Sequence, residues 1–169
     1  MVIGVLIMKN SKGYNMTSEE LRAVQLVELE LLCEVDRICR KCGITYRIVA
    51  GTLLGAVRHG GFIPWDDDAD VAFLREEYEQ FRAVCETELD TSRFYFQDHR
   101  NTLGYRWGYG KLRRKGTEFI RLNQEHMPYE QGILLICFLM TMFRIICSYG
   151  TCIVLNASCI VRLFGHRWG

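Results

Sequence analysis

Apolar residues recur every three or four positions between Ser18 and Cys42. That spacing predicts one long amphipathic helix. Thr17 followed by Glu20 forms a capping box for the start of the helix, and Gly43 suits its end. The apolar positions of the stripe are Leu21, Val24, Leu31, Leu32, Val35, Ile38, Cys39 and Cys42.

Shorter segments follow this helix, and most of them alternate or run apolar as strands do. We expect a strand at 44–49, a tight turn and short helix to 57, a strand at 66–73, a helix at 75–89, a strand at 93–97, and a hairpin of 104–112 with 117–122. The hairpin would turn around Lys115 and Gly116.

The composition changes abruptly after Gly132. Residues 133–169 contain no Asp, Glu or Lys, three Arg, and four of the eight cysteines. The apolar run at the N-terminus has no basic leader and no small-residue cleavage site, so it does not qualify as a signal peptide. We therefore divide the chain into a poorly ordered leader at 1–16, a domain at 17–132 and an aberrant hydrophobic tail at 133–169.

Charge and cysteine usage narrow the class of protein. The net charge is +1 and the isoelectric point about 7.6, which gives no electrostatic case for nucleic acid as a partner. Three cysteines have helical spacing in the first helix and four lie after Ile136, which is no disulfide framework. Cys39 and Cys42 form a lone CxxC, more typical of buried thiols than of zinc. We expect reduced thiols and a cytoplasmic protein.

Four aspartates stand directly before an apolar stretch. In a strand, Asp66, Asp68 and Asp70 would share one face with neighbours about 7 Å apart. Each adjacent pair would then repel by about 2.4 kcal/mol at an effective dielectric near 20. Such a cluster favours a hard divalent cation such as Mg²⁺. The alternative is a solvated acidic loop, which the apolar stretch and an upstream glycine turn make less attractive.

The glycine turn has its own chemistry. Gly51 and Thr52 lie where the predicted strand meets the short helix. Backbone N–H groups and a hydroxyl at a helix N-terminus are suited to hold a phosphate.

Residues Ala50 to Val71 read AGTLLGAVRHGGFIPWDDDADV. This run resembles, without gaps, the signature of the LicD family, bacterial phosphocholine transferases related to fukutin, and the resemblance extends over 17–81. The family belongs to the nucleotidyltransferase superfamily. The resemblance implies an α+β fold, a nucleotidyltransferase-like mixed sheet with flanking helices, which this chain would leave incomplete at its C-terminus.

The resemblance also implies roles for single residues. Gly51 and Thr52 match the turn that holds the donor phosphates, Asp68 and Asp70 match the paired metal carboxylates, and Asp66 would be an assisting acid. The implied cofactor is Mg²⁺, with Mn²⁺ as an alternative. The implied reaction transfers phosphocholine from CDP-choline to a glycan such as teichoic acid or lipopolysaccharide.

Other candidates are less specific. Arg58 and His59 match the motif and could contact phosphate, but a solvated pair is an equal alternative. Lys111 shares an alternating face with three aromatic residues and is a candidate for phosphate binding, although the basic cluster at 111–115 also suits a solvated hairpin tip. Trp65 could stack on the donor base or pack against the protein. His99 and His126 are expected to be structural or exposed.

The chain departs from the LicD pattern after Ile133. Relatives continue with a segment like Phe-Ile-Asp-Ile-Phe-Pro, whose Asp would be a third carboxylate, whereas Leu134 to Leu139 do not match. Back-translation of Met140 to Phe143 in a shifted frame forces an Asp and a Val of the family sequence, so a frameshifted tail is our hypothesis. A hydrophobic anchor is the alternative, although the charge-free run 145–161 falls short of the roughly 20 residues that span a bilayer.

These observations predict a LicD-type transferase acting on the cytoplasmic side, with contact to the inner face of the membrane left open. The chain itself is expected to be truncated and weakly active or inactive. The alternative function is a non-catalytic remnant that binds nucleotide or metal, with membrane association through its tail left open.

Overall fold

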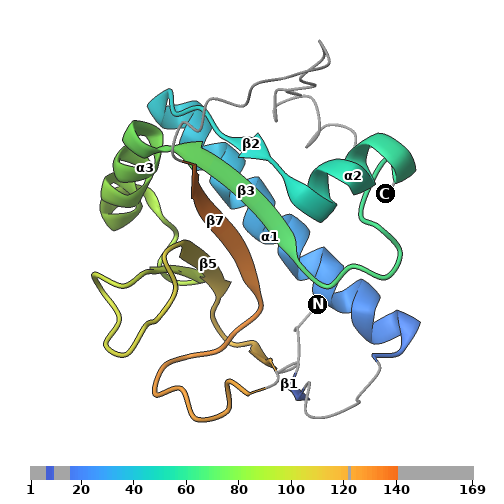
Figure 1. The fold of residues 1–169 in the computed structure, drawn as a ribbon. Coiled ribbons are helices and arrows are strands. Elements are labelled where there is room, and N and C mark those ends of the chain that lie inside the picture. The colour runs from blue at the N-terminus through green and yellow to red at the C-terminus, as the bar shows by residue number, and fades with distance from the viewer. Residues whose placement is uncertain (1–6, 10–15, 122, 141–169) are drawn as a thin grey trace.

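The computed structural model describes residues 7–9, 16–121 and 123–140. Its centre is a five-stranded mixed sheet in the order β2 (Arg47–Ile48), β3 (Ala69–Leu74), β7 (Leu134–Met140), β5 (Gly110–Arg114) and β4 (Phe94–Gln97). Strands β3 and β7 are parallel, and the other neighbours are antiparallel. A second, two-stranded sheet joins β1 (Ile7–Lys9) to β6 (Glu118–Ile120) in parallel. The predicted α+β class, a mixed sheet with helices, is confirmed (Figure 1).

The long helix α1 spans Ser18–Cys42 as predicted. The Glu20 N–H donates to Thr17 Oγ1 at 3.2 Å, and the Thr17 N–H donates to Glu20 Oε2 at 2.8 Å. These two bonds satisfy amides that have no partner within the first turn. Gly43 ends the helix with φ 68°, the left-handed conformation that glycine adopts without steric cost.

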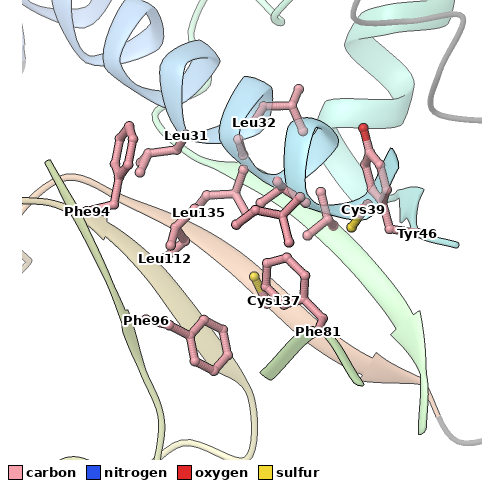
Figure 2. Packing of buried hydrophobic residues seen from close by; sticks show 14 of the residues in the cluster. Leu31, Leu32, Cys39, Tyr46, Phe81, Phe94, Phe96, Leu112, Leu135 and Cys137 are labelled. Atoms are coloured by element: carbon pink, nitrogen blue, oxygen red, sulfur yellow. The ribbon is translucent and has the colours of Figure 1, made fainter. Parts of the chain in front are cut away.

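Helices α1 and α3 (Arg75–Glu88) pack on the same face of the sheet. Figure 2 shows Leu31 of α1 and Phe81 of α3 among residues from the strands, including Leu112 and Leu135. The Phe81 ring stacks on Phe73 of β3 with centroids 4.8 Å apart. Burying such side chains contributes roughly 1.5–3 kcal/mol each, which makes this layer the main source of stability.

The opposite face of the sheet carries polar residues. The strand register places Asp70 beside Ile136, and Ile136 beside Lys111, so that these three side chains form one row. The next row, which contains Leu112 and Leu135, points into the helix-covered core. Because successive side chains alternate between faces, Asp70 and Lys111 lie on the face away from the core of α1 and α3.

Two predicted elements are wrong in part. The hairpin does not form, because β5 pairs with β4 and β7 whereas β6 pairs with β1. The strand expected at 66–73 starts only at Ala69. The helix of the glycine turn, α2, spans Ala50–His59 and leads from β2 toward β3.

The region that we expected to be a tail begins with β7, which lies between β3 and β5. Its first four residues are buried, and a continuous apolar run is what a strand covered on both faces requires. The candidate anchor 145–161 lies outside the described residues, as do 1–6 and 10–15 of the expected leader, whereas Ile7–Lys9 forms β1. Within the described ranges, no helix is both long enough and apolar enough to cross a membrane.

Candidate functional site

The loop before β3 gathers three carboxylates. Ligand oxygens of Asp66, Asp67 and Asp68 all lie within 4.8 Å of one another. We expected Asp66 and Asp68 on a strand about 7 Å from their neighbours; this was wrong, because the chain is not yet in strand conformation there. At 4.8 Å and an effective dielectric near 20, each charged pair repels by about 3.5 kcal/mol before solvent screening.

Asp70 is the fourth aspartate; it lies outside this cluster of three and is the most buried of the four. It lies in β3, its residue is 7% exposed, and its Oδ1 has no hydrogen-bond partner among the described residues. Burial raises the pKa of Asp70 to about 7, and the neighbouring Asp68 and Asp66 act in the same direction. Burial, followed by Asp68 and Asp67, also raises the pKa of Asp66. Both shifts mark a site with an excess of negative charge.

The glycine turn packs directly against this loop. A Cβ on Gly51 would lie 2.3 Å from Asp66 Oδ2, so no side chain fits there without moving the carboxylate. Ala50, the residue before it, has φ 48°, a conformation that costs a non-glycine residue roughly 1–2 kcal/mol. Such a strained turn beside a carboxylate cluster is typical of a functional site.

Thr52 is buried behind the turn, with 1% of its surface exposed. Its Oγ1 accepts a 2.8 Å hydrogen bond from the Asp70 N–H. The Val49 N–H donates to the Asp70 carbonyl at 3.2 Å, so the strand-to-helix junction is bonded on both sides of Asp70. Thr52 thus sets the position of Asp70, and its contact with phosphate stays a prediction.

Arg58 and His59 lie at the end of α2, where Arg58 is exposed. The His59 ring meets Trp65 edge-on, with centroids 6.3 Å apart. Trp65 is 73% exposed, which excludes a core role for it. Arg58 and Trp65 are exposed and His59 is half-buried, so a contact of these residues with phosphate or base stays a prediction.

Lys111 is buried among aromatic rings, as its predicted pattern indicated. Its Nζ lies 3.9 Å from the centroid of Trp107, 5.6 Å from Tyr105 and 5.8 Å from Tyr109. These rings belong to the loop before β5 rather than to the predicted strand. Burial lowers the pKa of Lys111 to about 7, with Arg113 and Arg121 adding to the effect.

The basic residues that follow Lys111 do not all form a solvated hairpin tip. Arg113 is 1% exposed, its Nε donates to Gln97 Oε1 at 2.7 Å, and its Nη1 donates to the Gly132 carbonyl at 2.6 Å. Arg114 Nε donates to Glu30 Oε2 of α1 at 2.9 Å. Arg113 thus links β5 to β4 and to the segment before β7, and Arg114 links β5 to α1.

Comparison with known proteins decides the family. A family model described as LicD/FKTN/FKRP, nucleotidyltransferase domain, matches residues 43–131. The chain belongs to the LicD family. It is 51% identical over 61 residues to the lipopolysaccharide cholinephosphotransferase LicD of Haemophilus influenzae, a match that covers 36% of this chain and 23% of that protein.

Other LicD relatives match over similar or shorter stretches. An uncharacterised protein of Rickettsia typhi is 40% identical over 65 residues, which are 38% of this chain and 20% of the relative. The human ribitol 5-phosphate transferase FKRP is 42% identical over 40 residues, 24% of this chain and 8% of the relative. The chain therefore spans less than a quarter of the curated relatives that it matches.

The departure from the LicD pattern falls inside the site. If the family segment Phe-Ile-Asp-Ile-Phe-Pro is laid without gaps over Leu134 to Leu139, its Asp coincides with Ile136. Ile136 pairs with Asp70 across β3 and β7, and with Lys111 across β5 and β7. An apolar residue, 9% exposed, thus occupies the position where the LicD resemblance implies a third carboxylate.

The sequence patterns missed three residues near the acidic loop. Glu28 of α1 is 1% exposed, and burial, followed by Asp68 and Asp67, raises its pKa well above the usual range. Arg121 Nη2 donates to Asp68 Oδ2 at 3.2 Å, and Asp67 itself belongs to the cluster. A signal for Glu28 existed: it follows Val24 by four positions and precedes Leu31 by three, so it lies within the apolar stripe of the helix.

These residues fit the metal that the LicD resemblance implies. All candidate ligands are carboxylate oxygens, the donor type that Mg²⁺ and Mn²⁺ prefer. Asp70 Oδ1 and Glu28 Oε2 are buried without a hydrogen-bond partner within the described part of the chain. A cation would satisfy such oxygens, which otherwise raise the free energy of the folded state.

Proposed function

We propose that this chain carries the cation- and phosphate-binding part of a site that transfers phosphocholine, or a related phospho-group, from a CDP-activated donor to a cell-surface glycan. The observation that carries the proposal is the contact between the Gly51 turn and the carboxylate of Asp66, within a cluster of three aspartates. A turn that presents amides beside clustered acids suits a diphosphate bound together with a divalent cation.

Each residue has a proposed part. Asp68 and Asp70 would hold Mg²⁺, or Mn²⁺ in its place, with Asp66 assisting. The amides at Gly51 would hold a donor phosphate, and Lys111 would neutralise another when it is protonated. Arg58 and His59, at the solvent-facing end of α2, would contact the outer part of the donor. When bound, the cation supplies positive charge that offsets the charge developing on the leaving phosphate.

The proposed step balances as a phosphoryl substitution. A hydroxyl oxygen of the glycan forms a bond to the phosphorus that carries the alcohol head group, and the bond from that phosphorus to the oxygen of CMP breaks. The hydroxyl proton passes to a carboxylate of the site or to water, and CMP leaves as the nucleotide. The residues of this chain act by orientation and charge, which is the main protein contribution to such reactions.

The names of the relatives support the class of reaction rather than one substrate. One relative is a lipopolysaccharide cholinephosphotransferase, and another is a ribitol 5-phosphate transferase. Both names describe transfer of a phosphate that carries an alcohol. We accordingly propose a CDP-linked alcohol as the donor, with lipopolysaccharide or teichoic acid as acceptor and action on the cytoplasmic side.

The test is release of CMP from CDP-choline and from CDP-ribitol by the purified chain, with and without Mg²⁺. We expect slow release that requires the cation and falls at least about tenfold in Asp68→Asn, since each 1.4 kcal/mol of lost stabilisation is a factor of ten. Glu76→Gln is the matched control, because Glu76 is an exposed carboxylate in the first turn of α3. Equal rates for the two variants, or release without cation, would reject the proposal.

A non-catalytic remnant is the second candidate, and the apolar Ile136 in the row of Asp70 favours it. Such a remnant would bind Mn²⁺ and a CDP-linked donor in equilibrium dialysis yet release no CMP. Sequencing the gene across the codons for Glu125 to Cys147 tests the frameshift that would explain it. A shifted frame that stays open with Ile-Asp-x-Phe-Pro supports a broken copy, and a frame that closes at once removes that explanation.

A further inference from the structure

Helix α1 brings a buried carboxylate to the underside of the acidic loop. Glu28 is 1% exposed, and its Oε2 has no hydrogen-bond partner within the described residues. An isolated buried carboxylate raises the free energy of the folded state by several kcal/mol. A core position between Val24 and Leu31 would ordinarily hold an apolar residue, so Glu28 has no packing rationale.

The same helix is fixed to the loop one turn earlier. The side-chain amide of Gln25 donates to the Ile63 carbonyl at 3.2 Å and to the Asp66 carbonyl at 3.1 Å. Gln25 and Glu28 are three positions apart and therefore lie on one side of α1. Because Gln25 holds the backbone of the loop, Glu28 lies on the side of α1 that faces the loop.

The positive charge present at this place does not balance the negative charge. Arg121 Nη2 donates to Asp68 Oδ2 at 3.2 Å and to the Asp67 carbonyl at 3.4 Å, whereas its buried Nε has no partner among the described residues. One guanidinium thus faces the three aspartates of the loop and Glu28. The remaining charge favours a further cation between the loop and α1.

We infer that Glu28 supports the cation site at the loop carboxylates Asp66, Asp67 and Asp68, and that its Oε2 binds the divalent ion through an ion-bound water. The inference rests on the cation site of the proposed function and adds a residue outside the glycine-aspartate motif. It explains why α1 carries an acid within its apolar stripe and why Gln25 fixes the loop above that acid. Residues that support metal ligands in this way typically change affinity by about tenfold to a hundredfold.

The test measures Mn²⁺ binding by electron paramagnetic resonance, together with thermal unfolding of the cation-free chain. Glu28→Gln keeps the size of the side chain and removes its charge. We expect its Mn²⁺ affinity to fall by about tenfold to a hundredfold, and its cation-free Tm to rise, because the fold no longer buries an ionisable carboxyl beside three aspartates. A merely structural carboxylate would give the opposite Tm change and leave Mn²⁺ binding intact.

Glu34→Gln is the matched control. Glu34 is also buried on α1, but it pairs with Arg37 at 2.7 Å and accepts from the Asp90 N–H. Its loss should lower the Tm and leave Mn²⁺ affinity unchanged. If Glu28→Gln does not fold, Glu28→Asp replaces it; withdrawing the oxygen by one methylene should still weaken Mn²⁺ binding, and unchanged affinity overturns the inference.

CMP release measured on the same samples separates the two ideas. Mn²⁺ binding that depends on Glu28, without any CMP release, supports the inference and rejects transfer by this chain. CMP release with Mn²⁺ affinity equal in wild type and Glu28→Gln rejects the inference alone. A wild-type chain that binds no Mn²⁺ also overturns it.

Discussion

Replacing Ile136 with Asp should complete the row of the site that the LicD resemblance implies. Ile136 is 9% exposed and pairs with Asp70 on the neighbouring strand. Neighbouring strands lie about 4.8 Å apart, so the two carboxylates of Ile136→Asp would be about 5 Å apart. We expect the folding stability of this variant to depend on a bound cation.

The magnitude follows from two terms. Loss of the buried isoleucine destabilises the fold by about 2 kcal/mol. Two carboxylates about 5 Å apart at an effective dielectric near 20 repel by about 3.3 kcal/mol when both are ionised, so the comparison belongs well above the folded pKa of Asp70, which is about 7. Ile136→Asn shares the first term and lacks the second, so the cation-free variants should differ by about 3 kcal/mol. For a domain of this size that difference corresponds to about 6–12 °C in Tm.

Thermal unfolding of both variants, with and without saturating Mn²⁺, checks the reasoning. Mn²⁺ should raise the Tm of Ile136→Asp by about 6–12 °C more than that of Ile136→Asn, because the cation offsets the repulsion. CMP release from CDP-choline should also increase in the Asp variant only. An equal Mn²⁺ shift in the two variants would refute the placement of Ile136 in the cation site.

The further predictions concern four single substitutions. Asp70→Asn should stabilise the cation-free chain by about 4 kcal/mol at pH 8 and hardly at pH 4, as measured by urea unfolding. The reason is that the free-energy penalty for ionising Asp70 in the fold begins near pH 3.8 and is complete above its folded pKa of about 7. Lys111→Met should raise the Tm at pH 6 more than at pH 10. The free-energy penalty for burying charged Lys111 is full below its folded pKa of about 7 and shrinks as the pH rises toward 10.5. Equal Tm shifts at the two pH values would contradict this reasoning. Gly51→Ala should weaken Mn²⁺ binding about tenfold by turning the Asp66 carboxylate, with about 1 kcal/mol of lost stability, because the contact is with the movable end of a side chain. Gly55→Ala, whose Cβ would lie 2.5 Å from the Gly61 carbonyl oxygen, should instead fail to fold stably, and circular dichroism distinguishes the two outcomes.

Local signals explain which parts of the fold could be predicted. The capping box at Thr17, the apolar period of α1 and Gly43 act within a few residues of one another, so the sequence carries them openly. The turn at Gly116 was also found, with φ 72°, but a turn does not determine which strands pair across the sheet. β5 pairs with β7 from far along the chain, and no local pattern encodes that choice.

The residues of the candidate site divide in the same way, into those with a local sequence signal and those that depend on how distant elements pack. The family motif indicated Asp66, Asp68 and Asp70, and the structure gathers Asp66 and Asp68 with Asp67 beside the Gly51 turn. Glu28 could not be found by motif, because its relation to the loop depends on how α1 docks. The sequence predicts an aberrant tail from residue 133, and its charge-free start forms β7; an apolar run suits a tail and a central strand alike, and only the sheet shows its partners.

The place of β7 between β3 and β5 has a consequence for synthesis of the chain. The ribosome makes β7 after every other strand of its sheet, so β3 and β5 expose facing, unpaired edges until residues 134–140 emerge. Unpaired edges recruit other chains, which makes the nascent protein dependent on a late and distant segment. The region 43–131 that matches the family model includes neither α1 nor β7, so that stretch by itself lacks the central strand of the sheet and the long helix of its core.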